Sequence, residues 1–147
     1  MSFDVITIGS ATVDHFADTD SELIRIDTRS HHEALIAFPL GSKLLINELK
    51  TTVGGGGTNT AVAFAHLGLK TAYLGKVGTD AAGDFVLDLL TKEGITFLGA
   101  REGQTGFSVI LNSIQDDRSI LAYKGANDHL HEKDVPQLDT QWLYLSS

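Results

Sequence analysis

The sequence contains no cysteine and only two prolines among its 147 residues. Without cysteine the chain can form neither a disulfide framework nor a thiolate metal site. No apolar run approaches the roughly 20 residues that a membrane-spanning helix needs. The first residues, Met1–Asp4, lack the basic and apolar regions of a signal peptide. We therefore expect a cytoplasmic protein without a membrane partner.

Positive charge is also scarce. Eleven Lys and Arg residues stand against 19 Asp and Glu residues, giving a formal net charge of -8. This acidity argues against nucleic acid as a partner, because an acidic surface repels a phosphate backbone. A phosphorylated small molecule remains compatible, since backbone N–H groups and one or two cations can hold a phosphate. With 42% hydrophobic residues, the chain suits one domain or part of a larger protein.

Glycine, in contrast, is concentrated in the run Gly54–Gly57. Four glycines give the backbone conformations that a Cβ would block. We expect Thr58, Asn59 or Thr60 to cap a helix that ends at Gly68. A bare loop before a helix N-terminus offers unpaired N–H groups to a polar ligand. A flexible turn before a core helix is the alternative interpretation, and four consecutive glycines favour ligand contact.

The rest of the pattern alternates strands and helices. Residues 3–8 are short and β-rich, which is typical of a buried parallel strand. Further strands are expected at 71–77 and 95–98, with a helix capped by Asp80 between them. This order predicts an α/β fold with a Rossmann-like, doubly wound parallel sheet.

Two polar residues, Thr12 and Asp14, follow the first strand. They lie beyond its carboxyl end, the edge at which open α/β sheets bind ligands. Both are therefore candidate ligand contacts. From this stretch alone, an ordinary turn residue is an equally good interpretation of Asp14.

Between the core elements, the sequence predicts a small antiparallel β lid. Residues 15–33 are polar and charged, and around His31-His32 we expect a solvated loop because no metal-ligand spacing accompanies the pair. Short β-rich runs follow too closely for βαβ crossovers. The expected lid strands are 23–26, 34–38, 43–46, 105–112 and 118–123. Gln115-Asp116-Asp117 is a hairpin signal between the last two.

The last segment, Trp142–Leu145, predicts another core strand. A sheet with so few parallel strands looks unfinished, so we expect the chain to be the first half of a longer protein. The expected division is an α/β core at residues 1–14, 53–100 and 128–147, and a β-sheet lid at 15–52 and 101–127.

Several spaced motifs carry a family resemblance. Gly54–Asn59 matches Gly-Gly-x-x-x-Asn, Leu67-Gly68 ends an Ala-rich helix, and Leu74–Gly83 matches Leu-Gly-x-Val-Gly-x-Asp-x-x-Gly. Gly9–Asp14 matches Gly-x-x-x-x-Asp after the first strand. Together these motifs resemble the N-terminal half of the ribokinase-like (PfkB) carbohydrate kinase family, over the whole chain.

The resemblance implies ATP-dependent phosphorylation of a sugar or nucleoside-like alcohol, with ATP and Mg²⁺ bound mainly by a C-terminal half. It implies substrate binding by Thr12, Asp14, Gly54, Gly55, Gly56 and Asn59. It implies lid positions at Thr105, Phe107, Tyr123 and Asn127. A homodimer through the lid is also expected.

The resemblance implies no catalytic residue and no metal ligand within these 147 residues. The family's catalytic Gly-Ala-Gly-Asp segment is absent, and the similar Ala81–Asp84 falls at a helix start, so Asp84 is not assigned as the base. We expect this chain alone to be inactive. Gly56 stands where ribokinases proper carry a lysine, which leaves the acceptor alcohol open.

Other functions fit the sequence less well. A non-catalytic, half-length sugar-binding or lid-mediated dimerisation module is the main alternative. A dinucleotide-binding domain lacks Gly-x-Gly-x-x-Gly after the first strand, and a P-loop lacks Gly-Lys-Ser/Thr after the glycines. Five basic side chains are candidate contacts for a substrate phosphate, and we expect them to be solvated surface charges instead: Arg29, His31, His32, Arg101 and Lys124.

Overall fold

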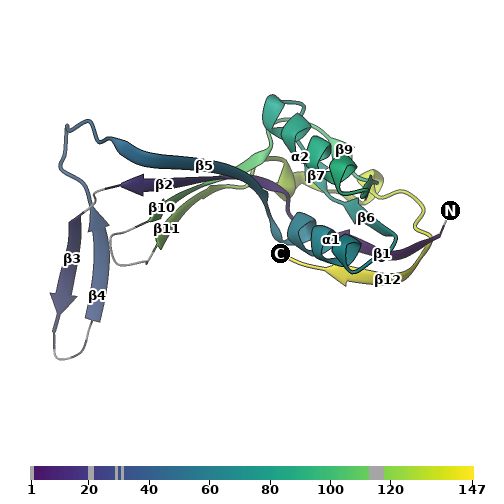
Figure 1. The fold of residues 1–147 in the computed structure, drawn as a ribbon, viewed down its shortest axis with the longest axis horizontal. Helices are drawn as coiled ribbons and strands as arrows, with labels where there is room; N and C mark the ends of the chain where they lie inside the picture. Colours follow the sequence, from purple (N-terminus) through teal and green to yellow (C-terminus); the bar gives the residue numbers. More distant parts are fainter. Residues whose placement is uncertain (1, 20–21, 29, 31, 113–117) are drawn as a thin grey trace. The chain divides into compact units, whose positions relative to one another are not determined.

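The computed structural model describes the chain except residues 1, 20–21, 29, 31 and 113–117, and gives only the backbone of 22–27 and 32–34 (Figure 1). Its contacts divide into two units. Unit 1 comprises Met1–Asp14, Thr52–Ser108 and Ala122–Ser147; unit 2 comprises His15–Thr51 and Val109–Leu121. Residues 101–108 and 122–127, which the sequence led us to expect in the lid, therefore lie in unit 1.

Unit 1 is built on a parallel four-stranded sheet. Its strands are β1 (Phe3–Ile8), β6 (Thr71–Leu74), β8 (Thr96–Phe97) and β12 (Thr140–Leu145), in the order β12-β1-β6-β8. Ile6 of β1 pairs with Leu143 on one side and Ala72 on the other, so β1 is an inner strand. The predicted α/β fold with a parallel sheet is confirmed.

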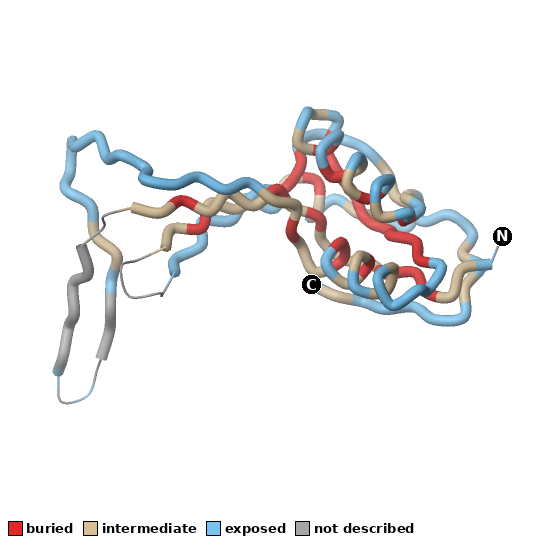
Figure 2. Tube along the Cα trace, viewed as in Figure 1, coloured by how far each residue is buried: buried red, intermediate tan, exposed pale blue. Residues whose placement is uncertain are grey.

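Two helices pack on this sheet: α1 (Gly56–His66) and α2 (Ala81–Lys92). Successive strand residues point to opposite faces, and β6 shows this directly. Tyr73 packs in one cluster with Ala61 of α1 and Leu90 of α2, whereas Ala72 and Leu74 pack in a second cluster. Figure 2 shows this buried strand beside the two helices.

The second predicted strand, 71–77, is split at Gly75. β6 ends at Leu74, and β7 (Lys76–Val77) pairs instead with β9 (Ala100–Arg101). Gly75 and Gly99 lie so close that a Cβ on Gly99 would overlap the Gly75 carbonyl. This close backbone approach, which the sequence pattern did not reveal, redirects the chain.

A second four-stranded sheet contains β2 (Thr12–Thr19), β5 (Ile46–Gly54), β10 (Gly106–Asn112) and β11 (Arg118–Tyr123), in the order β11-β10-β2-β5. Each strand continues from one unit into the other. A separate antiparallel hairpin joins β3 (Glu22–Asp27) and β4 (His32–Ala37). The predicted turn at 115–117 lies outside the described residues.

The lid strands differ from the predictions in two places. No strand was predicted at residues 15–19, which form the end of β2; Ala17 is buried there, as is Val13 earlier in the same strand. The expected strand 43–46 is displaced to Ile46–Gly54. β5 is largely exposed and its apolar residues Ile46 and Leu49 are exposed as well, so sheet pairing rather than a buried apolar pattern accounts for it.

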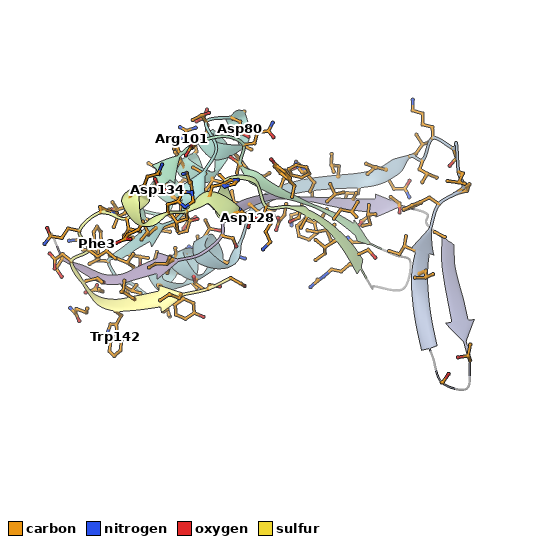
Figure 3. All side chains as sticks on the ribbon, turned by 180° about the vertical axis from the view of Figure 1, so that it is seen from behind. Phe3, Asp80, Arg101, Asp128, Asp134 and Trp142 are labelled. Carbon is orange, nitrogen blue, oxygen red and sulfur yellow. The ribbon has the colours of Figure 1, made fainter. Side chains whose placement is uncertain are left out.

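The predicted core strand at Trp142–Leu145 forms, but it is an edge strand. In the part of the chain that the structure describes, β12 has one neighbour in the sheet order, β1. Trp142 is 72% exposed, and Figure 3 shows its side chain projecting away from the sheet. Among the described residues, no helix is long and apolar enough to cross a membrane.

Candidate functional site

The helix after the glycine run begins earlier than predicted. α1 starts at Gly56, and Gly55 precedes it with φ of +103°, a left-handed conformation that glycine tolerates. The N-cap position is Gly55, which has no side chain to cap the helix, and Thr58 Oγ1 donates to the Gly54 carbonyl at 2.6 Å instead of accepting from a backbone N–H. The predicted capping by Thr58, Asn59 or Thr60 is therefore wrong. The predicted end at Gly68 is confirmed by its φ of +85°.

Ser10 caps α1 from a distant part of the chain. The Gly56 N–H donates to Ser10 Oγ at 3.1 Å, and the Gly57 N–H donates to the Ser10 carbonyl at 3.0 Å. The Thr58 N–H also points to that carbonyl, at 3.4 Å. These three amides are therefore occupied, and the expectation that they are free for a ligand is wrong. No local pattern reveals a cap that is 46 residues away.

The first two glycines of the run are required by close contacts. A Cβ on Gly54 would overlap the Asp14 carboxylate, and a Cβ on Gly55 would overlap the Ser10 carbonyl. The run thus lets the start of α1 approach the chain that leaves β1. The structure brings Asp14 and Gly54 together, as expected for residues of one site.

Thr12 and Asp14 point to the same side of β2, because residues two apart share a face of a strand. Thr12 Oγ1 donates to Asp14 Oδ1 at 2.8 Å. Thr12, Asp14 and Gly54 therefore form one polar group beyond the carboxyl end of β1. Asn59 lies on the exposed side of α1, and its N–H donates to the Gly55 carbonyl.

A cavity of about 480 Å³ opens within unit 1 beside this group. It is lined by Ile8, Gly9, Ser10, Thr12, Lys76, Phe107, Ser108, Ala122, Tyr123, Lys124, Asn127, Asp128, Leu130, Ser146 and Ser147. Hydroxyl and amide groups therefore share the lining with apolar side chains. The rings of Phe107 and Tyr123 pack 5.4 Å apart at this wall.

The predicted residues fall into two sets around the cavity. Thr12, Phe107, Tyr123 and Asn127 line it. The second set does not line the cavity and comprises Asp14, Gly54, Gly55, Gly56, Asn59 and Thr105. Thr12 belongs to the first set and binds Asp14 of the second, so it links the two.

Thr105, expected in the lid, is instead buried in a network at the start of α2. Its Oγ1 donates to Asp80 Oδ1 at 2.5 Å, and its N–H donates to Asp80 Oδ2 at 3.0 Å. Asp80 also accepts from the Gly83 N–H, which confirms it as the helix cap. Burial would raise the pKa of Asp80, but the bonds from Thr105 and Gly83 outweigh it and lower the pKa.

Lys76 is a lining residue that the sequence interpretation missed. Its side chain is 1% exposed, and its Nζ lies 2.6 Å from Glu102, 3.0 Å from Asp134 and 2.9 Å from the His129 carbonyl. The Glu102 contact raises the pKa of Lys76, against desolvation, and Asp134 adds to the effect. The sequence signal that could have identified Lys76 is the position of a lysine inside the otherwise largely apolar predicted strand 71–77.

The candidate phosphate contacts are placed differently from one another. Arg101 donates to the Gly78 carbonyl and to Asp84, at the start of α2 near Asp80 (Figure 3). Lys124 lines the cavity and is exposed. Arg29 and His31 lie outside the described residues, and only the backbone of His32 is described.

With this geometry established, comparison with known proteins identifies the family. The profile described as pfkB family carbohydrate kinase matches residues 3–147. The chain therefore belongs to this family.

Two curated relatives illustrate the similarity. The chain is 34% identical over 104 residues to a ribokinase of Haemophilus influenzae, covering 69% of this chain and 34% of that protein. It is 28% identical over 145 residues to a 5-dehydro-2-deoxygluconokinase of Clostridium perfringens, covering 96% and 37%. The chain thus spans little more than a third of the length of these relatives.

A solved structure supports the fold. The crystal structure of ribokinase from Cryptococcus neoformans in complex with ADP matches with a TM-score of 0.73 and 23% identity. The match covers 99% of this chain and 41% of that chain. The chain therefore has part of the ribokinase-like fold.

Proposed function

We propose that this chain is the acceptor-binding part of a carbohydrate kinase. The whole protein would transfer a phosphoryl group from ATP, with Mg²⁺, to a hydroxyl of a sugar or nucleoside-like alcohol. The observation that carries the proposal is the group formed by Thr12, Asp14 and Gly54 at the carboxyl end of β1, with Thr12 also lining the cavity. Family membership supports the same reaction class.

The chemistry of the cavity suits a small polyol. Thr12 offers a hydroxyl group, and the Asp14 carboxylate beside it accepts hydrogen bonds from hydroxyls. Phe107 and Tyr123 offer apolar surface to the C–H face of a ring. In this proposal Gly54, Gly55, Gly56 and Asn59 complete the acceptor site.

The nucleotide site is assigned to the rest of the protein. Phosphoryl transfer relies on positioning and on charge stabilisation around the phosphates. The Gly-Ala-Gly-Asp segment is not in this sequence, and the chain spans little more than a third of its curated relatives. We therefore expect no turnover from the 147 residues alone.

The test is ATP-dependent phosphorylation by the whole protein. Pentoses, hexoses, sugar acids and nucleosides would be offered with ATP and Mg²⁺, and both ADP and the phosphorylated product would be measured. We expect one class of alcohol to give product in proportion to ADP. Failure of every alcohol, with folded protein, would contradict the proposal.

A lid-mediated homodimer is the second candidate, as an accompanying or a separate role. β5 is an edge strand, and exposed apolar residues lie on it or just before it: Leu44, Leu45, Ile46 and Leu49. Such an edge favours pairing with another copy. Light scattering should give twice the monomer mass, and Leu49→Lys should restore the monomer. A monomeric wild-type protein would rule this candidate out.

A further inference from the structure

Asn127 lies in the short 3₁₀ segment Gly125–His129, and its side chain binds the chain that leaves β1. The Ala11 N–H donates to Asn127 Oδ1 at 2.9 Å. Asn127 Nδ2 donates back to the Ala11 carbonyl at 2.9 Å and to the Lys124 carbonyl at 3.0 Å. One carboxamide therefore binds both backbone groups of one residue, 116 positions away in the sequence.

Ala11 needs such a partner. It lies between β1 and β2, outside any strand, and is 0% exposed. Buried backbone N–H and C=O groups are costly when they are unpaired. The Asn127 side chain supplies one acceptor and one donor, in the way that a neighbouring strand would.

The two neighbours of Ala11 both belong to the site. Ser10 caps α1 and lines the cavity. Thr12 lines the cavity and donates to Asp14. The spacing of these two side chains therefore depends on the backbone at Ala11.

Asn127 is itself firmly held. The Ala126 N–H donates to the Gln104 carbonyl at 2.8 Å, and buried Lys76 binds the His129 carbonyl at 2.9 Å. A Cβ on Gly106, at the start of β10, would overlap Asn127 Nδ2. The carboxamide thus lies between fixed segments and has little room to turn.

We infer that Asn127 is a positioning residue for the acceptor site. By fixing the backbone at Ala11, it sets the spacing of Ser10 and Thr12 and thereby the affinity for the alcohol. This inference rests on the proposed function for its effect on catalysis. Its structural part, the restraint of residues 9–14, is independent of the reaction.

Two variants test the role. Asn127→Ala removes the carboxamide. Asn127→Asp keeps its shape and the acceptor for the Ala11 N–H, but it places an oxygen against the Ala11 and Lys124 carbonyls. We expect each to raise the KM for the alcohol about tenfold, the effect of one lost hydrogen bond of average strength or slightly more. The KM for ATP should change less than about twofold.

A matched control separates positioning from general loss of stability. Leu90→Ala removes a core side chain of α2 that is 1% exposed and does not line the cavity. It should lower the melting temperature and leave the KM for the alcohol unchanged. All kinetic measurements would be made in the whole protein, well below the melting temperature of each variant.

Hydrogen exchange gives a second readout without activity. In the whole protein, Asn127→Ala should increase exchange in the peptide covering residues 9–14 at least about tenfold, while Leu90→Ala should not change that peptide selectively. If the wild-type enzyme is active and Asn127→Ala changes only the melting temperature, the inference is wrong. If no alcohol is phosphorylated, the proposed function fails, and exchange alone decides whether Asn127 restrains the segment.

Discussion

The two units differ in how many apolar side chains they bury and in how well their buried polar groups are hydrogen-bonded. Unit 1 holds nearly all of the buried apolar side chains; among the described residues only Ala17 and Ile110 of that class belong to unit 2. Buried polar groups of unit 1, such as Lys76 and Thr105, have several partners each. In unit 2, Thr19 Oγ1 is buried and has no partner among the described residues. Among the described side chains, unit 1 therefore has a core of its own, whereas those of unit 2 belong mainly to paired strands with little buried apolar surface.

This contrast suits the proposed division of roles. A site that orients a hydroxyl needs rigid walls, and the packed unit supplies them. A sheet with few buried apolar contacts opens at lower cost, as expected for a lid. The contrast predicts that equivalent substitutions have unequal effects in the two units.

The largest difference is expected between core and surface leucines. Leu90→Ala in unit 1 should lower the free energy of unfolding by about 2–5 kcal/mol, because it leaves a cavity. Leu40→Ala in unit 2, at a fully exposed position, should change it by less than about 0.5 kcal/mol. Denaturant unfolding of both variants measures the difference. Equal losses of unfolding free energy in the two variants would contradict the difference in packing between unit 1 and unit 2.

The next effect concerns the buried ammonium group. Lys76→Met should destabilise the protein by about 1–3 kcal/mol, because it leaves Asp134 and the His129 carbonyl without their partner. Lys92→Met, on the exposed end of α2, is the matched control. Unfolding curves that superimpose for the two variants would show that the Lys76 contacts contribute nothing.

A smaller, pH-dependent effect is expected at Asp80. Its pKa is lowered below the ordinary 3.8, so the folded state favours the carboxylate more than the unfolded chain does. The resulting stability is fully present above about pH 4 and is lost as the pH falls through the folded-state pKa. The difference in stability between wild type and Asp80→Asn should therefore become smaller as the pH decreases.

Melting temperatures between pH 7 and pH 3 measure this effect. Asp88→Asn, on the exposed side of α2, controls for the loss of one charge. A gap between Asp80→Asn and wild type that stays constant over this range would contradict the assignment.

The smallest effect is optical and concerns the edge strand. Trp142 is the single tryptophan among these 147 residues, so in this chain tryptophan fluorescence reports on β12 alone. In the 147-residue chain, iodide should quench it strongly, because it is 72% exposed. We expect the rest of the protein to cover this exposed edge strand. The quenching of Trp142 emission, taken as the difference between wild type and Trp142→Phe, should then be weaker in the whole protein. Equal quenching in both would show that β12 remains uncovered.

Local signals in the sequence were reliable where one segment determines its own structure. The inner strand β1, the Asp80 cap and the glycine at the end of α1 were all predicted. The family motifs also drew attention to Thr12 and Asp14, which the structure brings together. Their roles remain proposals.

The features that the sequence did not predict have a common physical origin in long-range contacts. The cap of α1 comes from Ser10, and the partner of Asn127 is Ala11, both far away in the sequence. Thr105, expected in the lid, serves Asp80 instead. β5 is exposed over most of its length, so its strand conformation depends on pairing with its neighbour and not on an apolar pattern of its own.

The central claim is that the alcohol is bound beyond the carboxyl end of β1, beside Asp14. The most direct test is kcat/KM of Asp14→Asn in the whole protein, with Asp88→Asn as the control. We predict a decrease of about 10- to 100-fold for Asp14→Asn, since hydrogen bonds to charged groups contribute about 1.5–3 kcal/mol. The control should stay within about twofold of wild type. Unchanged kcat/KM for Asp14→Asn would place the acceptor elsewhere and contradict the account.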